Sequence, residues 1–302
     1  MALCVAKGRL LQQLQPICRC LFQCQLQQRL QPHTSAIHRN WHEHDRKSGY
    51  DTFEQRPVKD MIKEGFQLLP EEMKKLKEEW LTKLRCDSWI PQEHGDYEVF
   101  WKFDSKESVD AWQISSDSDH NEGKSKCELV LSKQQTAIFK GTLDTEPPKD
   151  GKTKYAGYCS IGSPKNYMSF YREDSYDWSH YTHIVMRVRG DGRNYNLLLA
   201  MNWYYDVNWN DGYSFVLFTR GGPYWQTAKI PFSKFILQAK GRIQDKQEAI
   251  TLNRIGNFNI MIADNNPGDF QLEIDYIALV YDESHKEKFA YEMYEVPIYK
   301  IG

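Results

Sequence analysis

The sequence predicts an all-β fold, a jelly-roll-like antiparallel β-sandwich preceded by short N-terminal helices. From Asp96 onward, apolar and polar residues alternate along short runs, which is typical of strands with one face on a core. Gly, Pro, Asn and Asp separate the runs, and no helical pattern lies between them, which argues against a parallel α/β sheet. The alternating positions are Val99, Trp101 and Phe103; Cys127, Leu129 and Leu131; Ala137, Phe139 and Gly141; Ile184, Met186 and Val188; Phe215 and Leu217; Phe258, Ile260 and Ile262; and Leu272, Ile274 and Tyr276.

Before the sandwich, the apolar residues follow the period of a helix. Proline interrupts a helix interior but suits a first turn, so Pro70 predicts the end of one helix and the start of another. We expect the two helices either to pack against the following domain or to form a detached arm for a partner. The stripes are Val58, Ile62 and Phe66 before Pro70, and Met73, Leu76, Trp80 and Leu84 after it.

The N-terminal segment differs in composition from the rest of the 302-residue chain. Five basic residues and no acidic ones precede Glu43, and Leu10, Leu14, Ile17 and Leu21 recur at helical spacing. A basic amphipathic segment without acids predicts a mitochondrial transit peptide, and a Gln-rich disordered tail is the alternative.

Four segments follow from these patterns. We expect a transit peptide at 1–40, a polar linker and amphipathic helical segment at 41–95, a β-sandwich domain at 96–291 and a C-terminal tail at 292–302.

Charge and apolar content exclude two classes of partner. Without the leader, 34 Lys and Arg stand against 41 Asp and Glu, so a nucleic-acid partner is not expected. No apolar run is long enough to cross a membrane, so any membrane association is expected to be peripheral.

The cysteines indicate neither a disulfide framework nor a zinc site. Outside the leader they are Cys86, Cys127 and Cys159, an odd number without a CxxC pair, which fits a reducing compartment. We expect Cys127 and Cys159 to be small core residues rather than nucleophiles.

Two motifs could carry chemistry. Gly123, Lys124 and Ser125 match the end of a phosphate-binding loop, but Ser118 stands where that loop needs a glycine and no strand-to-helix pattern surrounds it. Glu273 and Asp275 share one face of a predicted strand, where they could act as acid and base or be solvated or hydrogen-bonded. The sequence predicts no catalytic residue and therefore no enzyme.

Acidic turns raise the question of a metal. Without a complete Ca²⁺-binding loop, we expect these side chains to cap turns. A lone His42/His44 pair beside a processed terminus is also poor evidence, so no metal or other cofactor is expected. The oxygen-bearing residues are Asp117, Asp119, Asn121 and Glu122, and then Asp264, Asn265 and Asp269.

Aromatic residues crowd the segment MNWYYDVNWNDG (201–212) between two predicted strands. Trp203, Tyr204, Tyr205 and Trp209 are candidates for binding a partner if the rings are exposed on a loop, and they are core residues if the segment is a strand. Exposed rings could stack on a sugar or contact another protein.

Turn and aromatic motifs carry a resemblance to a known family. SYDWS (175–179), RVRGDGR (187–193), FTRGGPYWQ (218–226), IPFSKF (230–235) and LEIDYIALVYD (272–282) resemble the mitochondrial complex I intermediate-associated protein family, also called the NADH dehydrogenase assembly factor 1 family. The resemblance covers about residues 97–291. It assigns these residues to the structural motif: Trp178, Arg187, Arg189, Gly190, Asp191, Gly192, Arg220, Gly221, Gly222, Pro223, Trp225 and Asp275.

The resemblance implies a galactose-binding-like β-sandwich in the mitochondrial matrix, held peripherally at the inner membrane. It implies a non-enzymatic chaperone for assembly of complex I, acting on membrane-arm intermediates with an adaptor protein and an acyl-CoA-dehydrogenase-like flavoprotein. One departure is visible, because the family usually has Gly-Gly in its first sandwich loop and this chain keeps only Gly123. The alternative function is a carbohydrate-binding module that stacks Trp203, Tyr204 and Trp209 on sugar rings.

Overall fold

The computed structural model describes residues 58–85, 93–149, 151, 153, 155–202, 211–239 and 241–292. The chain divides into two compact units, Met1–Phe66 and Gln67–Gly302. The predicted transit peptide lies outside the described residues, and so does most of the predicted C-terminal tail. The sandwich belongs to the second unit.

One helix, α2 (Val58–Arg85), takes the place of the two that the sequence predicts. Pro70 lies inside it, so the prediction of a break there is wrong. Proline removes one N–H from the helix ladder and costs about 3 kcal/mol in a helix interior. Strong helix formers surround it, with Leu69 before it and Glu71 and Glu72 after it, and the helix continues through the proline.

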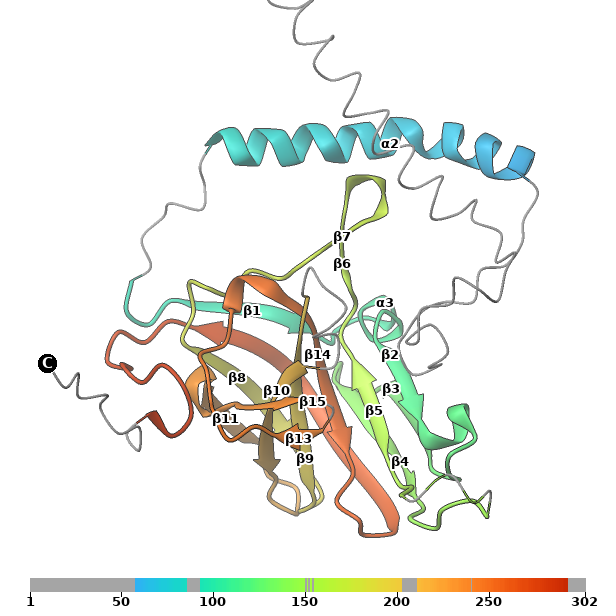
Figure 1. The fold of residues 1–302 in the computed structure, drawn as a ribbon, viewed down its shortest axis with the longest axis vertical. Coiled ribbons are helices and arrows are strands. Elements are labelled where there is room, and N and C mark those ends of the chain that lie inside the picture. The colour runs from blue at the N-terminus through green and yellow to red at the C-terminus, as the bar shows by residue number, and fades with distance from the viewer. Residues whose placement is uncertain are drawn as a thin grey trace, which may run out of the picture. The chain divides into compact units, whose positions relative to one another are not determined.

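Two antiparallel sheets form the sandwich (Figure 1). The strands of the first sheet are β1 (Tyr97–Lys102), β3 (Lys126–Leu131), β4 (Ala137–Leu143), β8 (His183–Arg189), β11 (Gln226–Pro231) and β15 (Gly268–Val280). Their order is β11-β8-β15-β4-β3, and β1 pairs with the C-terminal half of β15.

The second sheet has seven strands in the described part of the chain. They are β2 (Gln113–Ser116), β5 (Cys159–Gly162), β9 (Asn194–Met201), β10 (Asp211–Phe218), β12 (Ile236–Ala239), β13 (Arg242–Ile243) and β14 (Ile255–Ile262). Their order is β13-β12-β10-β9-β14-β5-β2. A separate hairpin is formed by β6 (Asn166–Met168) and β7 (Arg172–Asp174). The predicted all-β sandwich with an N-terminal helix is confirmed.

Short helical segments connect the strands. They are α3 (Lys106–Asp110) and the 3-10 turns η3 (Asp117–His120), η4 (Ser169–Tyr171), η6 (Phe232–Lys234) and η7 (Leu252–Arg254). The chain passes between the sheets several times, since β8, β11 and β15 lie in one sheet and the strands between them in sequence lie in the other.

The core lies between the sheets, where the alternating residues point. Ile184, Met186 and Val188 of β8 and Phe258 and Ile260 of β14 are fully buried, as the period-two pattern predicts. The removal of this apolar surface from water is the main contribution to the folding free energy of a sandwich of this kind.

Two β-bulges break the predicted alternation. The register between β1 and β15 shifts between Val99 and Trp101, and Val99 is 45% exposed instead of buried. The register between β15 and β8 shifts between Ile274 and Tyr276, after which the buried positions resume at Ile277. A bulge inserts one extra residue and so reverses which face the following residues occupy.

Helix α2 contacts the β6–β7 hairpin through two glutamates. Glu72 accepts a hydrogen bond from the N–H of Phe170. Glu79 accepts the N–H of Ser169 at 2.5 Å and pairs with Arg172 at 2.6 Å. Phe170 has a φ of +60°, and successive N–H groups at such a turn form a concave site for an anion. Carboxylates of the helix therefore fill this concave site.

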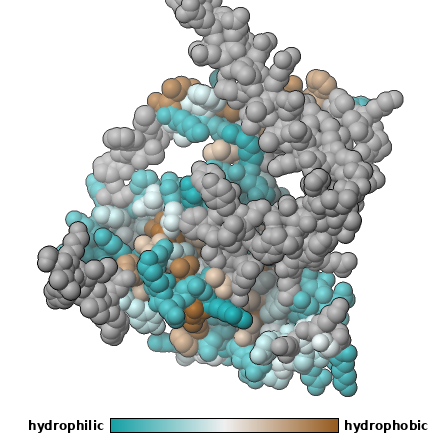
Figure 2. Space-filling model, in the orientation of Figure 1, coloured by the Kyte–Doolittle hydropathy of each residue, from teal (hydrophilic) through white to brown (hydrophobic). Residues whose placement is uncertain are grey.

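In the second half of the apolar stripe of α2, three residues are exposed and Leu76 is partly buried. Met73, Trp80 and Leu84 are 48%, 54% and 74% exposed. Figure 2 shows hydrophobic residues at the surface, interspersed with hydrophilic ones. In the part of the chain that the structure describes, no helix combines the length and apolar character that crossing a bilayer requires.

Candidate functional site

The two glycine-rich motifs form neighbouring loops. One loop joins β8 to β9 and the other joins β10 to β11. Thr219 links them, because its hydroxyl donates to the Arg193 carbonyl at 2.7 Å and accepts the N–H of Gly192 at 3.1 Å. A Cβ at Gly190 would lie 2.3 Å from the Cβ of Thr219, so only glycine fits there. The loops are thus packed as one unit.

The turns take the conformations for which their glycines were expected. Gly192 has a φ of +93° and Gly222 a φ of +100°. Gly221 lies close to the carbonyl of Asp191, where an added Cβ would be 3.3 Å from the oxygen. Two motifs that are separate in the sequence therefore meet at their turns.

A glutamine closes the loop between β10 and β11. The Gln226 side chain accepts the N–H of Arg220 at 3.1 Å and donates to the carbonyl of Phe218 at 2.9 Å. Pro223 is exposed, and the residues Phe218 and Tyr224 are 68% and 76% exposed. The end of β10 and the loop that follows thus present two aromatic side chains to solvent on a hydrogen-bonded backbone.

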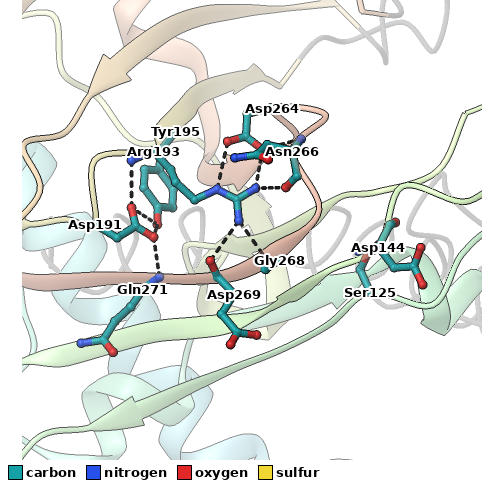
Figure 3. Close-up of polar contacts among 10 residues, drawn as sticks. All are labelled: Ser125, Asp144, Asp191, Arg193, Tyr195, Asp264, Asn266, Gly268, Asp269 and Gln271. Atoms are coloured by element: carbon teal, nitrogen blue, oxygen red, sulfur yellow. Dashed lines mark hydrogen bonds and ion pairs between the residues drawn. The ribbon is translucent and has the colours of Figure 1, made fainter.

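Arg193 binds the turn between β14 and β15 to the end of the first loop (Figure 3). Its side chain is 10% exposed, and the guanidinium donates to both carboxylate oxygens of Asp264, at 2.9 and 2.6 Å. It also donates to the carbonyls of Asn266, Gly268 and Asp269, the last two at 3.2 and 3.1 Å. We call these five residues the Arg193 network. Its bidentate geometry is the strongest form of an arginine–carboxylate contact.

Electrostatics favour the charged state of both partners in the Arg193 network. The hydrogen bond with Asp264 raises the pKa of Arg193, against the effect of burial. Burial raises the pKa of Asp264, but the hydrogen bonds from Arg193 and the backbone, with the arginine's charge, outweigh it and hold that pKa below its ordinary value. The pair is therefore ionised throughout the neutral range.

Asp191 fixes the first loop from the other side. It accepts the N–H of Arg193 at 3.0 Å, the N–H of Gln271 at 2.8 Å and the hydroxyl of Tyr195 at 3.3 Å (Figure 3). Burial and the neighbouring carboxylate raise the pKa of Tyr195, which keeps its hydroxyl protonated as a donor. Asp191 is thus a structural acceptor that ties β15 to the loop.

On the outer face of the first sheet, two arginines cover one tryptophan. The guanidinium carbons of Arg187 and Arg189 lie 4.9 and 5.2 Å from the centre of the Trp225 ring. Arg187 pairs with Asp275 and Arg189 with Glu273. We call these five residues the arginine–tryptophan stack. Its contacts combine cation–π attraction with ion pairs.

The two carboxylates of β15 are acceptors in this stack. Glu273 is 1% exposed and also accepts the hydroxyl of Thr136 at 2.6 Å. Asp275 lies at the bulge of β15. Tyr276 is the residue that pairs with Arg187 in the ladder, and the Asp275 carboxylate accepts a hydrogen bond from the Arg187 side chain. Each carboxylate thus has its own arginine, an arrangement that favours the hydrogen-bonded alternative for this pair over the acid/base one.

The glycine–lysine–serine motif surrounds a buried carboxylate instead of a phosphate. Asp117 is fully buried and accepts the N–H and the hydroxyl of Ser125 and the N–H of Gly157, each at 2.8–2.9 Å. A Cβ at Gly123 would lie 2.0 Å from the Asp117 carboxylate, so this position of the loop requires glycine. Ser125 also accepts the N–H of Asp144 at 3.0 Å, and the two lie apart from the Arg193 network in Figure 3.

The other acidic residues also serve as hydrogen-bond acceptors. Asp119 accepts the N–H and hydroxyl of Ser116 at 2.8 and 2.9 Å, as a turn-capping residue does. Asn121 takes a left-handed conformation with a φ of +57° and ends η3. Within the described ranges, no group of three His, Cys, Asp or Glu side chains could hold a metal ion.

Trp178 lies apart from the loops, in the core. It is fully buried and packs against the rings of Phe232, Tyr176, Phe100 and Trp101 at centroid distances of 5.6–6.3 Å. In the structure, Trp178 packs the aromatic part of the core.

The predicted partner-binding residues lie outside the described residues. These are Trp203, Tyr204, Tyr205 and Trp209. Whether they bind a sugar, bind a protein or fill the core stays a prediction.

Two residues of the site escaped prediction from the sequence. Arg193 is the last residue of the RGDGR motif, and its position directly after a tight glycine turn is the sequence feature that could have pointed to it. For Glu273 the sequence leaves open a catalytic, a solvated or a hydrogen-bonded carboxylate, because its arginine partner follows from strand pairing that the sequence does not show.

Comparisons with known proteins agree with the motif resemblance. A family model described as Complex I intermediate-associated protein 30 (CIA30) matches residues 101–274. A Drosophila melanogaster protein named "Complex I intermediate-associated protein 30, mitochondrial" is 46% identical over 275 residues, covering 90% of this chain and 93% of that protein. A Mus musculus protein of the same name is 39% identical over 226 residues, covering 74% and 69%.

Carbohydrate-binding modules are among the solved structures that match the chain. A family 11 module from Clostridium thermocellum, in complex with a β-1,3-1,4-mixed-linked tetrasaccharide, has a TM-score of 0.45 at 20% identity and covers 64% of this chain and 100% of the module. A family 29 module has a TM-score of 0.33 at 10% identity, covering 63% and 91%. These values carry no inference about a ligand. By the family model and the relatives in fly and mouse, the chain belongs to the complex I intermediate-associated protein 30 (CIA30) family.

Proposed function

We propose that the chain is a non-enzymatic assembly factor, a chaperone, for mitochondrial respiratory complex I. The observation that carries the proposal is the relative in Drosophila, which bears the name of a complex I intermediate-associated protein and is 46% identical over 93% of its own length. Identity across nearly all of both chains supports transfer of the whole protein's role, because the sandwich and its loops are matched together.

The loop surface supports a binding role. Phe218 at the end of β10 and Tyr224 on the following loop are exposed, and the partly exposed Arg187 and Arg189 lie over Trp225 of the same loop. Aromatic residues and arginine dominate the energetics of protein interfaces. Because backbone hydrogen bonds and the Arg193 network hold the loops, little conformational entropy is lost when a partner binds.

The chemistry of the site supports a mechanism without a covalent step. Asp264, Glu273 and Asp275 are each paired with an arginine, and Asp191 accepts three donors. Each of these carboxylates is thus already engaged as a hydrogen-bond acceptor within the protein. In this mechanism the sandwich covers an apolar face of an unfinished subunit module and lowers its tendency to aggregate until the next module displaces it.

The finer parts of the proposal concern place and partners. The predicted transit peptide at 1–40 would direct the chain to the mitochondrial matrix, where it would associate peripherally with the inner membrane. The partners proposed are membrane-arm intermediates of complex I, an adaptor protein and an acyl-CoA-dehydrogenase-like assembly factor. Support for these comes from the motif resemblance and from relatives that are named mitochondrial.

The test is depletion and re-expression in cells of the source organism. Mitochondria without this chain are expected to lose mature complex I on native gels and to accumulate a membrane-arm subassembly. The full-length wild type restores the mature complex. Normal complex I in depleted mitochondria would overturn the proposal.

Surface variants locate the partner site in the same cells. Replacing both Phe218 and Tyr224 by serine is expected to reduce mature complex I without lowering the amount of the variant protein. The matched control is Tyr155→Ser, since Tyr155 is 89% exposed and lies outside the loop. A parallel pair, Trp203→Ala and Trp209→Ala, tests the partner-binding prediction for the 201–212 segment.

A further inference from the structure

Two cysteines from different sheets meet inside the sandwich. Cys127 lies on β3 of the first sheet and Cys159 on β5 of the second, and both side chains point toward the core. Cα atoms of β3 and β5 lie within 8 Å of one another, which is closer than the usual spacing of about 10 Å between packed sheets. Both thiols are free.

The two thiols are close enough to shift each other's pKa, and they differ in accessibility. Contact with Cys159 lowers the pKa of Cys127, against the effects of burial and of the Asp119 and Asp117 carboxylates. The same contact, with burial, raises the pKa of Cys159. Cys127 is partly exposed, whereas Cys159 is fully buried. The Sγ of Cys127 is also 3.7 Å from the Ser115 carbonyl oxygen, so the side chain is held toward β2, the strand that pairs with β5.

We propose that Cys127 and Cys159 are an oxidisable dithiol that forms a reversible disulfide between the two sheets, with a peroxide as the oxidant. The partly exposed Cys127 is the attacking thiol, because the thiolate is the reactive form and a peroxide must reach it from solvent. The buried Cys159 is the resolving thiol and needs no access to solvent.

The reaction balances in two steps. The Cys127 thiolate attacks hydrogen peroxide and breaks the O–O bond, giving the sulfenic acid and hydroxide, which takes up the proton lost from the thiol. The Cys159 sulfur then attacks the Cys127 sulfur, the S–S bond forms, and the sulfenic oxygen leaves as water. Two thiols and one peroxide thus give one disulfide and two waters, and a dithiol reductant reverses the oxidation.

The position of the pair gives the disulfide a structural effect. β3 is the edge strand of the first sheet, and β5 lies next to β2, the edge strand of the second. A disulfide here turns the segment between Cys127 and Cys159 into a closed loop. The closed loop lowers the conformational entropy of the unfolded chain and so raises the melting temperature of the oxidised protein. The inference does not depend on the proposed function.

The test uses the full-length protein, treated with hydrogen peroxide, blocked with a thiol alkylator and mapped by peptide mass spectrometry. The expected product is a peptide pair joined through Cys127 and Cys159, lost on treatment with dithiothreitol. The oxidised protein is expected to melt about 5–10 °C higher than the reduced one. Peroxide treatment that leaves both residues alkylated as free thiols, or that links Cys127 only to another cysteine, overturns the proposal.

Single variants test the order of attack. Cys159→Ser is expected to stop at a Cys127 sulfenic acid that a dimedone probe labels, whereas Cys127→Ser leaves Cys159 unlabelled. The reverse pattern of labelling would refute the assignment of Cys127 as the attacking thiol. If a variant does not fold, the disulfide map of the wild-type protein still decides whether the bond forms.

Discussion

Removing the Arg193 side chain is expected to destabilise the sandwich more than removing any exposed arginine. Arg193→Ala leaves Asp264, 16% exposed, without its counter-charge and leaves three backbone carbonyls without their donor. Breaking a buried ion pair from one side costs about 3–5 kcal/mol. Because the carbonyls lie at a turn that water can reach, we expect the total to stay near the lower end, about 3–4 kcal/mol.

The assay is urea unfolding of the full-length protein, followed by the fluorescence of core tryptophans. In a domain of this size the loss corresponds to a fall in Tm of about 10 °C. Asp264→Ala should cost about 2–3 kcal/mol, and a double-mutant cycle with Arg193→Ala should give a coupling free energy of about 1.5–3 kcal/mol. Arg220→Ala, which truncates an exposed arginine on the adjacent loop, is the matched control and should change stability by less than about 0.5 kcal/mol. A cost for Arg193→Ala no larger than that of the control would refute this account of the network.

The remaining predictions concern Gly123, His183 and Glu273. Gly123→Ala should destabilise the protein by about 2–4 kcal/mol in urea unfolding, since the new Cβ would lie 2.0 Å from the Asp117 carboxylate; an unchanged midpoint would contradict this. Burial, with Lys229 and His285, lowers the pKa of His183 from 6.5 to about 4, so between these pH values the unfolded chain binds a proton that the folded chain does not. Stability should therefore fall as pH falls through this window, by about 3 kcal/mol at pH 4, and His183→Gln should remove that part of the dependence. Glu273→Ala should cost about 2–4 kcal/mol by leaving the Thr136 hydroxyl and the partner arginine without their acceptor, and a neutral result in thermal unfolding would rule out this role.

Much of the sandwich was predictable because each strand has one face on a single core. Ile184, Met186 and Val188 alternate in the sequence and are fully buried in β8. The prediction failed at Val99, because a β-bulge is a property of two paired strands and leaves no mark in either sequence alone. It also failed at Pro70, which lies inside α2. The free-energy cost of the proline falls on one turn, whereas the stabilising contributions of the other residues add up along the whole helix.

The glycine turns of the candidate site could be predicted from the sequence, whereas its ion pairs could not. Gly192 and Gly222 could be assigned to tight turns because only glycine takes a positive φ without strain. The contact of Arg193 with Asp264 joins residues that are distant in the chain, and it follows from the order of the strands rather than from either motif. The aromatic segment at 201–212 was found from composition, and its residues Trp203 to Trp209 stay a prediction.

The most direct test of the central claim, that the chain acts by holding an assembly intermediate, is the native size of its complexes. Mitochondria that carry a tagged full-length chain are separated on a native gel, and each band is analysed for complex I subunits. The account predicts that the chain co-migrates with membrane-arm subassemblies and is absent from mature complex I. A chain found only as a free protein, or only within the mature complex, would contradict it.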